Sequence, residues 1–159
     1  MRKVVLSLLV ENNFGVLSRV AGLFSRRGYN INSLTVGETE NPVFSRMTIV
    51  TSGEEDVLEQ IRKQLAKLSE VNEIRELPPG DSVARELILL KVTAAEEQRP
   101  QIISIAGVFR ANIVDVSENT LMIELTGSKE KISAFINLIG ISRIREMART
   151  GITGLARGE

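Results

Sequence analysis

The 159-residue sequence contains no histidine and no cysteine. The absence of histidine removes the commonest general base and the commonest metal ligand of proteins. The absence of cysteine excludes disulfides, thiolate nucleophiles and thiolate zinc sites. An enzyme of this composition would depend on carboxylates, lysines, the single tyrosine Tyr29, or a cofactor. We therefore expect neither a catalytic centre nor a metal site in this chain.

Aromatic residues, excess charge and long apolar runs are also scarce. Aromatic residues make up 4% of the chain and tryptophan is absent, which argues against a wide surface for stacking nucleic-acid bases. The 20 basic and 20 acidic residues balance, so no net charge attracts nucleic acid or anionic lipid. The apolar run at 3–10 stops at Glu11, and no run approaches the roughly 18 residues that a membrane span needs. We expect a cytoplasmic protein that binds neither nucleic acid nor membrane.

The spacing of the apolar residues predicts six elements in the first half of the chain. Four runs rich in β-branched and apolar residues predict strands, at 3–10, 29–38, 44–53 and 71–77. Two stretches with apolar side chains every three or four residues predict helices, at 16–27 and 54–70. Gly28 follows two arginines and has the position of a helix-ending glycine. The order is therefore β-α-β-β-α-β.

The same order returns after a break in the pattern. The segment "PPGDS" at 78–82 has linker composition. Beyond it, strands are predicted at 83–94, 111–117, 120–127 and 141–150, and helices at 96–110 and 128–140. Residue-level similarity between the halves is not evident, so the repeat is one of element order.

Two β-α-β-β-α-β units of about 75 residues predict an α+β protein with two ferredoxin-like domains. We place the first domain at 1–77 and the second at 83–159, joined by the linker 78–82. Each domain would cover one face of an antiparallel sheet with two helices and leave the other face bare. Such small domains bury little surface alone, so we expect a homodimer.

The first strand passes into the first helix through Asn12-Asn13-Phe14-Gly15. The free N–H groups at a helix start and the helix dipole favour an anion, and a glycine lets a ligand approach the backbone. A free amino acid fits this pattern, with its carboxylate at the helix end and its ammonium at an asparagine oxygen. Ordinary turn and N-cap chemistry also explains the same residues, and on spacing alone it is the favoured interpretation. Asn30 and Asn32, in the second strand, are likewise either turn residues or a second polar contact.

Several motifs together resemble one family. They are "LLVENNFGVLSRVAGLFSRRGYNINSLTV", "SRMTIVTSG" and "LEQIRKQLAKL" in the first half, and "VARELILLKV", "FRANIVDVS", "SAFINLI" and "EMARTGITGLARGE" in the second. This sequence closely resembles the small, regulatory subunit of acetohydroxyacid synthase, also called acetolactate synthase. The resemblance covers essentially the whole chain, with the motifs in the family's order.

The resemblance implies that the first domain is an ACT domain, which binds amino acids where two copies pair. Its effector is expected to be valine, held by Asn12, Gly15, Val16 and Leu17 of one chain and Asn30 of its partner. The catalytic subunit is a separate chain that carries thiamine diphosphate, Mg²⁺ and FAD. The present chain would hold no cofactor, would activate that subunit and would confer feedback inhibition in branched-chain amino acid biosynthesis. The second domain would contribute to dimerisation and to contact with the catalytic subunit.

Other functions and one segment stay open. A free-standing enzyme is disfavoured because the acids fall mainly at helix starts and on polar faces. A DNA-binding regulator is disfavoured because the predicted helices lack a basic face. An amino-acid sensor of ACT type that regulates another enzyme or transcription is the alternative. The tail, 150–159, is either a mobile end or a segment that becomes ordered on the catalytic subunit.

Overall fold

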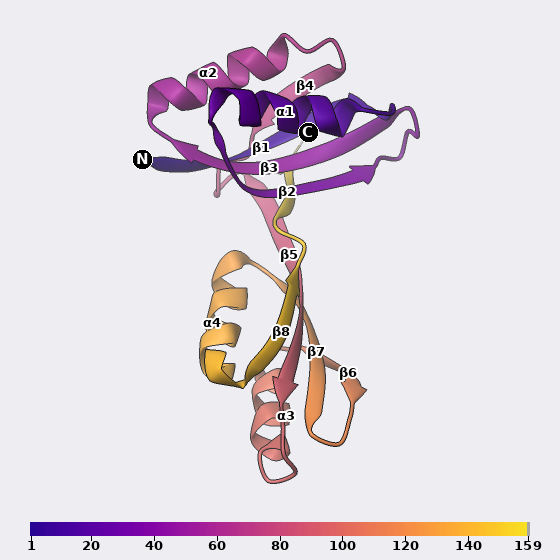
Figure 1. Ribbon diagram of the computed structural model, residues 1–159, viewed down its shortest axis with the longest axis vertical. Coiled ribbons are helices and arrows are strands. Elements are labelled where there is room, and N and C mark those ends of the chain that lie inside the picture. The colour runs from indigo at the N-terminus through magenta and orange to yellow at the C-terminus, as the bar shows by residue number, and fades with distance from the viewer. Residues whose placement is uncertain (159) are drawn as a thin grey trace. The chain divides into compact units, whose positions relative to one another are not determined.

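Each half of the chain forms one antiparallel sheet with two helices on one face (Figure 1). The computed structural model describes residues 1–158 and divides them into two units. The first unit comprises residues 1–84 and the tail from Ile152 onward, and the second comprises Arg85–Gly151. The β-α-β-β-α-β order predicted for each half is confirmed.

The first unit has its sheet in the order β2-β3-β1-β4. Its elements are β1 (Arg2–Glu11), α1 (Val16–Arg27), β2 (Asn30–Glu38), β3 (Phe44–Gly53), α2 (Glu55–Ala66) and β4 (Val71–Glu76). Alternate residues of β1 face the helices, so Leu6 and Leu8 are buried opposite Ile49 and Met47 of β3. α1 closes over this face with Val16, Val20, Leu23 and Phe24. The strand β2 is left at the edge of the sheet, where half of its backbone groups have no neighbouring strand.

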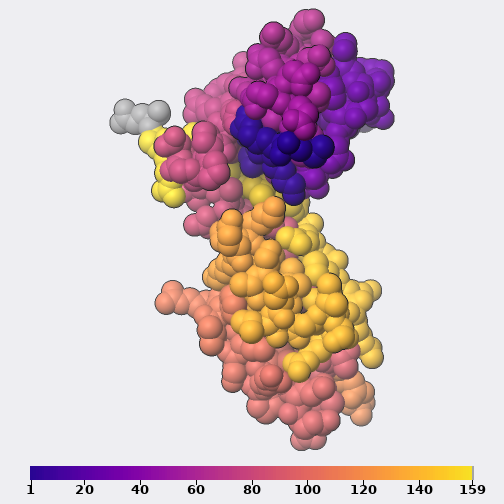
Figure 2. Space-filling view, turned by 90° about the vertical axis from the view of Figure 1, so that its left-hand side faces the viewer, coloured from indigo at the N-terminus to yellow at the C-terminus, as the bar shows by residue number. Residues whose placement is uncertain are grey.

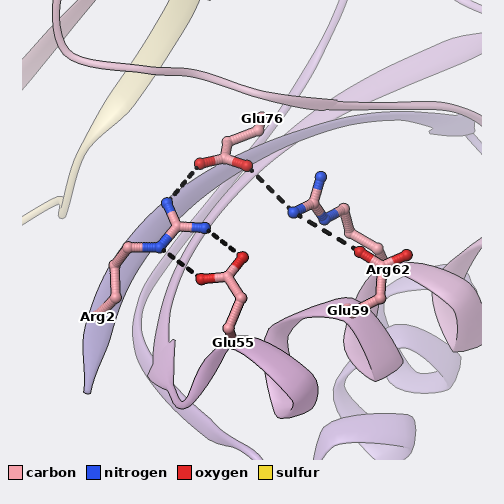
Figure 3. Close-up of polar contacts among 5 residues, drawn as sticks. All are labelled: Arg2, Glu55, Glu59, Arg62 and Glu76. Atoms are coloured by element: carbon pink, nitrogen blue, oxygen red, sulfur yellow. Dashed lines mark hydrogen bonds and ion pairs between the residues drawn. The ribbon is translucent and has the colours of Figure 1, made fainter.

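A network of exposed ion pairs joins β1, α2 and β4 of this unit (Figure 3). The Arg2 guanidinium donates to both carboxylate oxygens of Glu55, at 3.0 and 3.1 Å, and to Glu76 at 2.8 Å. These hydrogen bonds raise the pKa of Arg2, and the bonds to Glu55 contribute more than the bond to Glu76. Arg62 shares Glu76 at 3.3 Å and reaches Glu59 at 3.9 Å. The network links the start and middle of α2 to β1 and β4 and pairs Arg2 and Arg62 with carboxylates.

The second unit repeats the architecture with the strand order β6-β7-β5-β8. Its elements are β5 (Ser82–Thr93), α3 (Arg99–Val108), β6 (Asn112–Val116), β7 (Thr120–Gly127), α4 (Lys129–Ile139), a 3₁₀ helix (Ile141–Arg143) and β8 (Ile144–Arg149). Its core centres on Phe135, which is fully buried and meets Phe109 edge-on at 5.3 Å between ring centres. The predicted strand 141–150 begins later than expected, because Ile141–Arg143 form the 3₁₀ turn after Gly140.

The tail differs from both interpretations that the sequence offered. Thr153–Ala156 form a further strand, β9, which pairs with β5. Gly154 lies against Val83 and Ala84, the part of β5 that belongs to the first unit, so the tail belongs to the first unit rather than to the second. The Thr35 hydroxyl donates to the Ile152 carbonyl at 3.3 Å, and the Arg157 amide donates to the Asp81 carbonyl at 2.7 Å. In Figure 2 the tail, in bright yellow, lies against the pink residues of the first unit. A four-residue strand without hydrophobic alternation carries no periodic signal, so the sequence could not reveal it.

Replacing Gly154 by alanine is expected to loosen the tail. A Cβ at this position would lie 2.9 Å from the Val83 carbonyl oxygen and 3.2 Å from the Leu77 side chain, so the backbone must shift. We expect a loss of about 1–3 kcal/mol from the free energy of unfolding, measured by urea denaturation. Leu155→Ala is the control, because Leu155 is exposed and its loss should cost less than about 0.5 kcal/mol. Equal stabilities of the two variants would contradict a packed tail.

Candidate functional site

The loop between β1 and α1 brings a glycine to the helix start with open space around it. Gly15 is the N-cap of α1 and has φ 89° and ψ −7°, a left-handed conformation that favours glycine. A Cβ built on Gly15 would meet no atom within 4 Å. The glycine therefore serves the backbone turn, and it also leaves the helix start accessible from outside.

The first turn of α1 presents unpaired backbone donors. The first helical hydrogen bond runs from the Arg19 amide to the Gly15 carbonyl at 3.0 Å, and the Val16 amide meets the Asn13 carbonyl at only 3.4 Å. Within residues 1–158 the amides of Leu17 and Ser18 have no acceptor, and no side chain caps the helix. This turn also contains no acidic residue. Free N–H groups together with the positive end of the helix dipole form a site suited to an anion.

Asn12 is held at this site by the hairpin between β2 and β3. Its side-chain nitrogen donates to the Pro42 carbonyl at 3.0 Å and lies 3.4 Å from a Glu38 carboxylate oxygen. The backbone amide of Asn12 donates to the Val43 carbonyl at 2.7 Å. The Asn12 side-chain oxygen therefore remains available as an acceptor, next to a carboxylate. Sequence reasoning missed Glu38, because the contact crosses 26 positions and ends a strand without any motif.

Asn13 behaves as a turn residue, since its side chain donates to Glu11 at 2.9 Å. Asn32 is likewise structural. Its side-chain oxygen accepts from the Ser52 hydroxyl at 3.1 Å, and it lies where the register of β2 against β3 shifts. In a regular strand, residues two apart such as Asn30 and Asn32 would lie on the same side of the sheet, and this bulge interrupts that alternation.

Asn30 lies far from the loop within one chain. It begins β2, whereas Glu38, the neighbour of Asn12, ends the same nine-residue strand. A strand rises roughly 3.3 Å per residue, so the two ends of β2 are about 26 Å apart. Asn30 is exposed, and its side-chain amide has no hydrogen-bond partner among the residues that the structure describes. One chain thus brings Asn12, Gly15, Val16 and Leu17 together but leaves Asn30 at the other end of the edge strand.

Large apolar side chains are exposed around the loop. They are Phe14, which is fully exposed, and the partly exposed Leu17, Val36 and Val43. Val16, in contrast, points into the core. Its side chain therefore anchors the helix, and only its backbone can face a ligand.

Among residues 1–158, no three or more acidic side chains gather into a group that could hold a metal ion. None of the helices in this part of the chain is long and apolar enough to cross a membrane.

Comparison with known proteins gives one family for both halves. A family profile described as an AHAS small subunit-like ACT domain matches residues 6–73. A second profile, described as the small subunit of acetolactate synthase, matches residues 85–158. The second match begins at residue 85, where the second unit also begins.

Individual relatives agree along the full length. The probable acetolactate synthase small subunit of Methanothermobacter thermautotrophicus is 52% identical over 97% of this chain and 92% of its own length. The acetolactate synthase isozyme 3 small subunit of Escherichia coli is 48% identical over 98% of this chain and 96% of its own length. The crystal structure of the acetolactate synthase small subunit from Thermotoga maritima, 42% identical, superposes with a TM-score of 0.92 over 100% of this chain and 99% of that one. With an ACT domain first and a second domain that matches the same family, this chain belongs to the acetolactate synthase small subunit family.

Proposed function

We propose that this chain activates the catalytic subunit of acetolactate synthase and makes it sensitive to feedback inhibition by valine. The observation that carries the proposal is the start of α1, where two free backbone amides lie behind a glycine with open space around it. A carboxylate can bind there without any lysine or arginine. An amino-acid effector is therefore the ligand class that the geometry favours.

In this proposal the carboxylate of valine approaches past Gly15. It accepts hydrogen bonds from the free amides in the first turn of α1, including the Leu17 amide. Its ammonium group donates to the Asn12 side-chain oxygen, and the Glu38 carboxylate supplies a nearby negative charge. The isopropyl group would contact apolar side chains around the loop, such as the half-exposed Leu17. Asn12 thus contributes an oxygen whose orientation is fixed by its bond to Pro42.

The site becomes complete only in a homodimer. If the exposed edges of two β2 strands pair in antiparallel fashion about a twofold axis, the start of one strand lies beside the end of the other. The partner's Asn30 then comes next to Glu38 and Asn12 of the first chain. The exposed edge of β2 and the apolar side chains near the loop both support this pairing.

A ligand between two chains can regulate because its contacts depend on how the chains are arranged. Valine would stabilise one arrangement of the dimer and thereby change how the dimer holds the catalytic subunit. A coupling of about 1–3 kcal/mol is typical of such systems. We assign catalysis, with thiamine diphosphate, Mg²⁺ and FAD, to the catalytic subunit and none of it to this chain. The second domain is proposed to contribute to dimerisation and to contact with that subunit.

Reconstitution tests the proposal. The purified chain is added to its catalytic subunit, and acetolactate formation from pyruvate is measured with and without valine. We expect the chain to raise the activity and valine to lower it again, while valine leaves the activity of the catalytic subunit alone unchanged. Activity that is independent of the chain would contradict the proposal.

Replacing Asn30 by alanine should weaken valine binding mildly. The loss of one hydrogen bond costs about 0.5–1.5 kcal/mol, a two- to tenfold rise in the dissociation constant. Calorimetry with valine on the isolated chain measures the change. Asn32→Ala is the matched control, since its amide already bonds Ser52 and its removal should leave valine affinity nearly unchanged. An unaltered affinity of Asn30→Ala would remove this residue from the site.

A further inference from the structure

A hollow on the helix side of the first unit lies apart from the loop before α1. It has a volume of about 670 Å³ and is lined by Leu23, Arg26, Arg27, Tyr29, Gln60 and Gln64. The last turn of α1 and the middle of α2 form its walls, with the Tyr29 hydroxyl donating to the Gln60 oxygen at 3.3 Å. Guanidinium, amide and phenol groups make this lining rich in hydrogen-bond donors.

Arg26 and Arg27 at this hollow lack the side-chain partners that five other arginines of the first unit have. Arg2, Arg19, Arg62 and Arg75 each pair with a glutamate, and Arg46 donates to the Ser7 hydroxyl at 2.8 Å. Arg26 and Arg27 have no carboxylate within ion-pair distance anywhere in residues 1–158. Within the same range, Lys63 and Lys67 also have no carboxylate within ion-pair distance. Lys63 lies on α2 directly before Gln64, which lines the hollow, and Lys67 is the C-cap of the same helix. The result is an uncompensated cationic surface, which we define by Arg26, Arg27, Lys63 and Lys67.

A glycine inside α1, Gly22, lies beside the guanidinium of Arg26. Gly22 lies mid-helix, where glycine costs about 1 kcal/mol relative to alanine. Its backbone does not need glycine, because its φ is not positive. The single atom near a Cβ at this position is Arg26 Nη1, at 3.2 Å. Because that atom is the far end of an exposed, flexible side chain, a shift of a few tenths of an ångström makes room for a methyl group at this position.

We propose that this cationic surface is where the first domain docks on an acidic, carboxylate-bearing surface of the catalytic subunit. The inference rests on the proposed function, which requires such a protein partner. Arginine binds carboxylates through two parallel hydrogen bonds and is enriched at protein interfaces. The four cations extend beyond the hollow onto the outer side of α2, a spread that suits a protein surface better than one small anion. The valine site and this docking surface then lie at different places on the same domain.

Charge reversal tests the docking surface. The affinity of the full-length chain for its catalytic subunit is measured from the concentration that gives half-maximal activation, at low and at high salt. For Arg26→Glu with Arg27→Glu we expect at least a tenfold loss at low salt, with a smaller difference from wild type at high salt, where exposed charges are screened. The control is Arg75→Glu with Arg157→Glu, which makes the same change in charge at two exposed positions of the same unit outside this surface. Its affinity for the catalytic subunit should fall less than threefold.

Gly22→Ala is a control for helix stability. The added methyl needs the Arg26 guanidinium to move by only a few tenths of an ångström, it changes no charge, and alanine strengthens the helix. We therefore expect the melting temperature to rise or stay the same while affinity for the catalytic subunit stays close to that of the wild type. Wild-type affinity in the variant with both Arg26→Glu and Arg27→Glu would overturn the inference.

Three further outcomes have defined meanings. Saturable binding of inorganic phosphate that Arg26→Glu with Arg27→Glu abolishes, with unchanged activation, would show a small-anion site and overturn the docking assignment. A wild-type chain that fails to activate the catalytic subunit at any salt would contradict the proposed function itself. Normal activation and normal valine inhibition in the charge-reversed variant would reject only the docking surface.

Discussion

Gly15→Asp is expected to abolish inhibition by valine while activation of the catalytic subunit survives. The new carboxylate would occupy the open space in front of the first turn of α1 and repel the carboxylate of the ligand. Two like charges 4 Å apart repel by about 4 kcal/mol at an effective dielectric constant near 20. The valine concentration for half-maximal inhibition should therefore rise at least about a hundredfold, since each 1.4 kcal/mol corresponds to a factor of ten.

Two controls separate charge from backbone strain. Gly15→Asn fills the same space and tolerates the left-handed conformation as well as aspartate does, but it carries no charge. It should weaken inhibition less than Gly15→Asp. Gly28→Asp places the same residue at another left-handed glycine, φ 69°, at the far end of α1. Valine titration of the reconstituted complex compares all three, and normal inhibition of Gly15→Asp would argue against the site.

Phe135→Ala is expected to destabilise the second domain strongly. Phe135 is fully buried at the centre of that core, and truncating such a phenylalanine costs about 3–5 kcal/mol. A domain of this size has a stability of only about 4–11 kcal/mol. We propose that the two domains fold as separate units, so hydrogen exchange should become faster in β5 and β7 while β1 and β3 keep their protection.

Leu138→Ala on the same helix is the control, because Leu138 is 59% exposed. Its free energy of unfolding should change by less than about 0.5 kcal/mol. Equal loss of protection in both sheets of Phe135→Ala would mean that the halves unfold as one unit. That result would contradict the proposed division into domains.

Hydrophobic periodicity was sufficient to predict the element order of both domains. In the first unit, β1 and α2 have strong apolar patterns, and the residues of these patterns form its core. The apolar residues of the second unit likewise form one core. The features that sequence reasoning missed depend on contacts across the fold. The bulge at Asn32, the contact of Glu38 with Asn12 and the strand β9 all involve partners that are distant in the chain, and no local spacing encodes them.

The candidate site was predictable in part for the same reason. Its backbone component is local: a glycine before a helix start predicts free amides, and the structure contains them. Its side-chain component is not local, since the orientation of Asn12 is set by Pro42. Asn30 could be assigned to a partner chain only from the family resemblance. The geometry of β2 now supplies a physical reason, because the strand is too long for both ends to serve one site.

A crystal structure of the chain grown with valine tests the central claim most directly. The account predicts one valine per chain at the start of α1, with its carboxylate on the free amides behind Gly15 and its ammonium at Asn12. Asn30 of a second copy should complete the contact across paired β2 strands. If the space between the start of α1 and the second copy is empty at saturating valine, or is filled by the protein's own side chains, the account is contradicted.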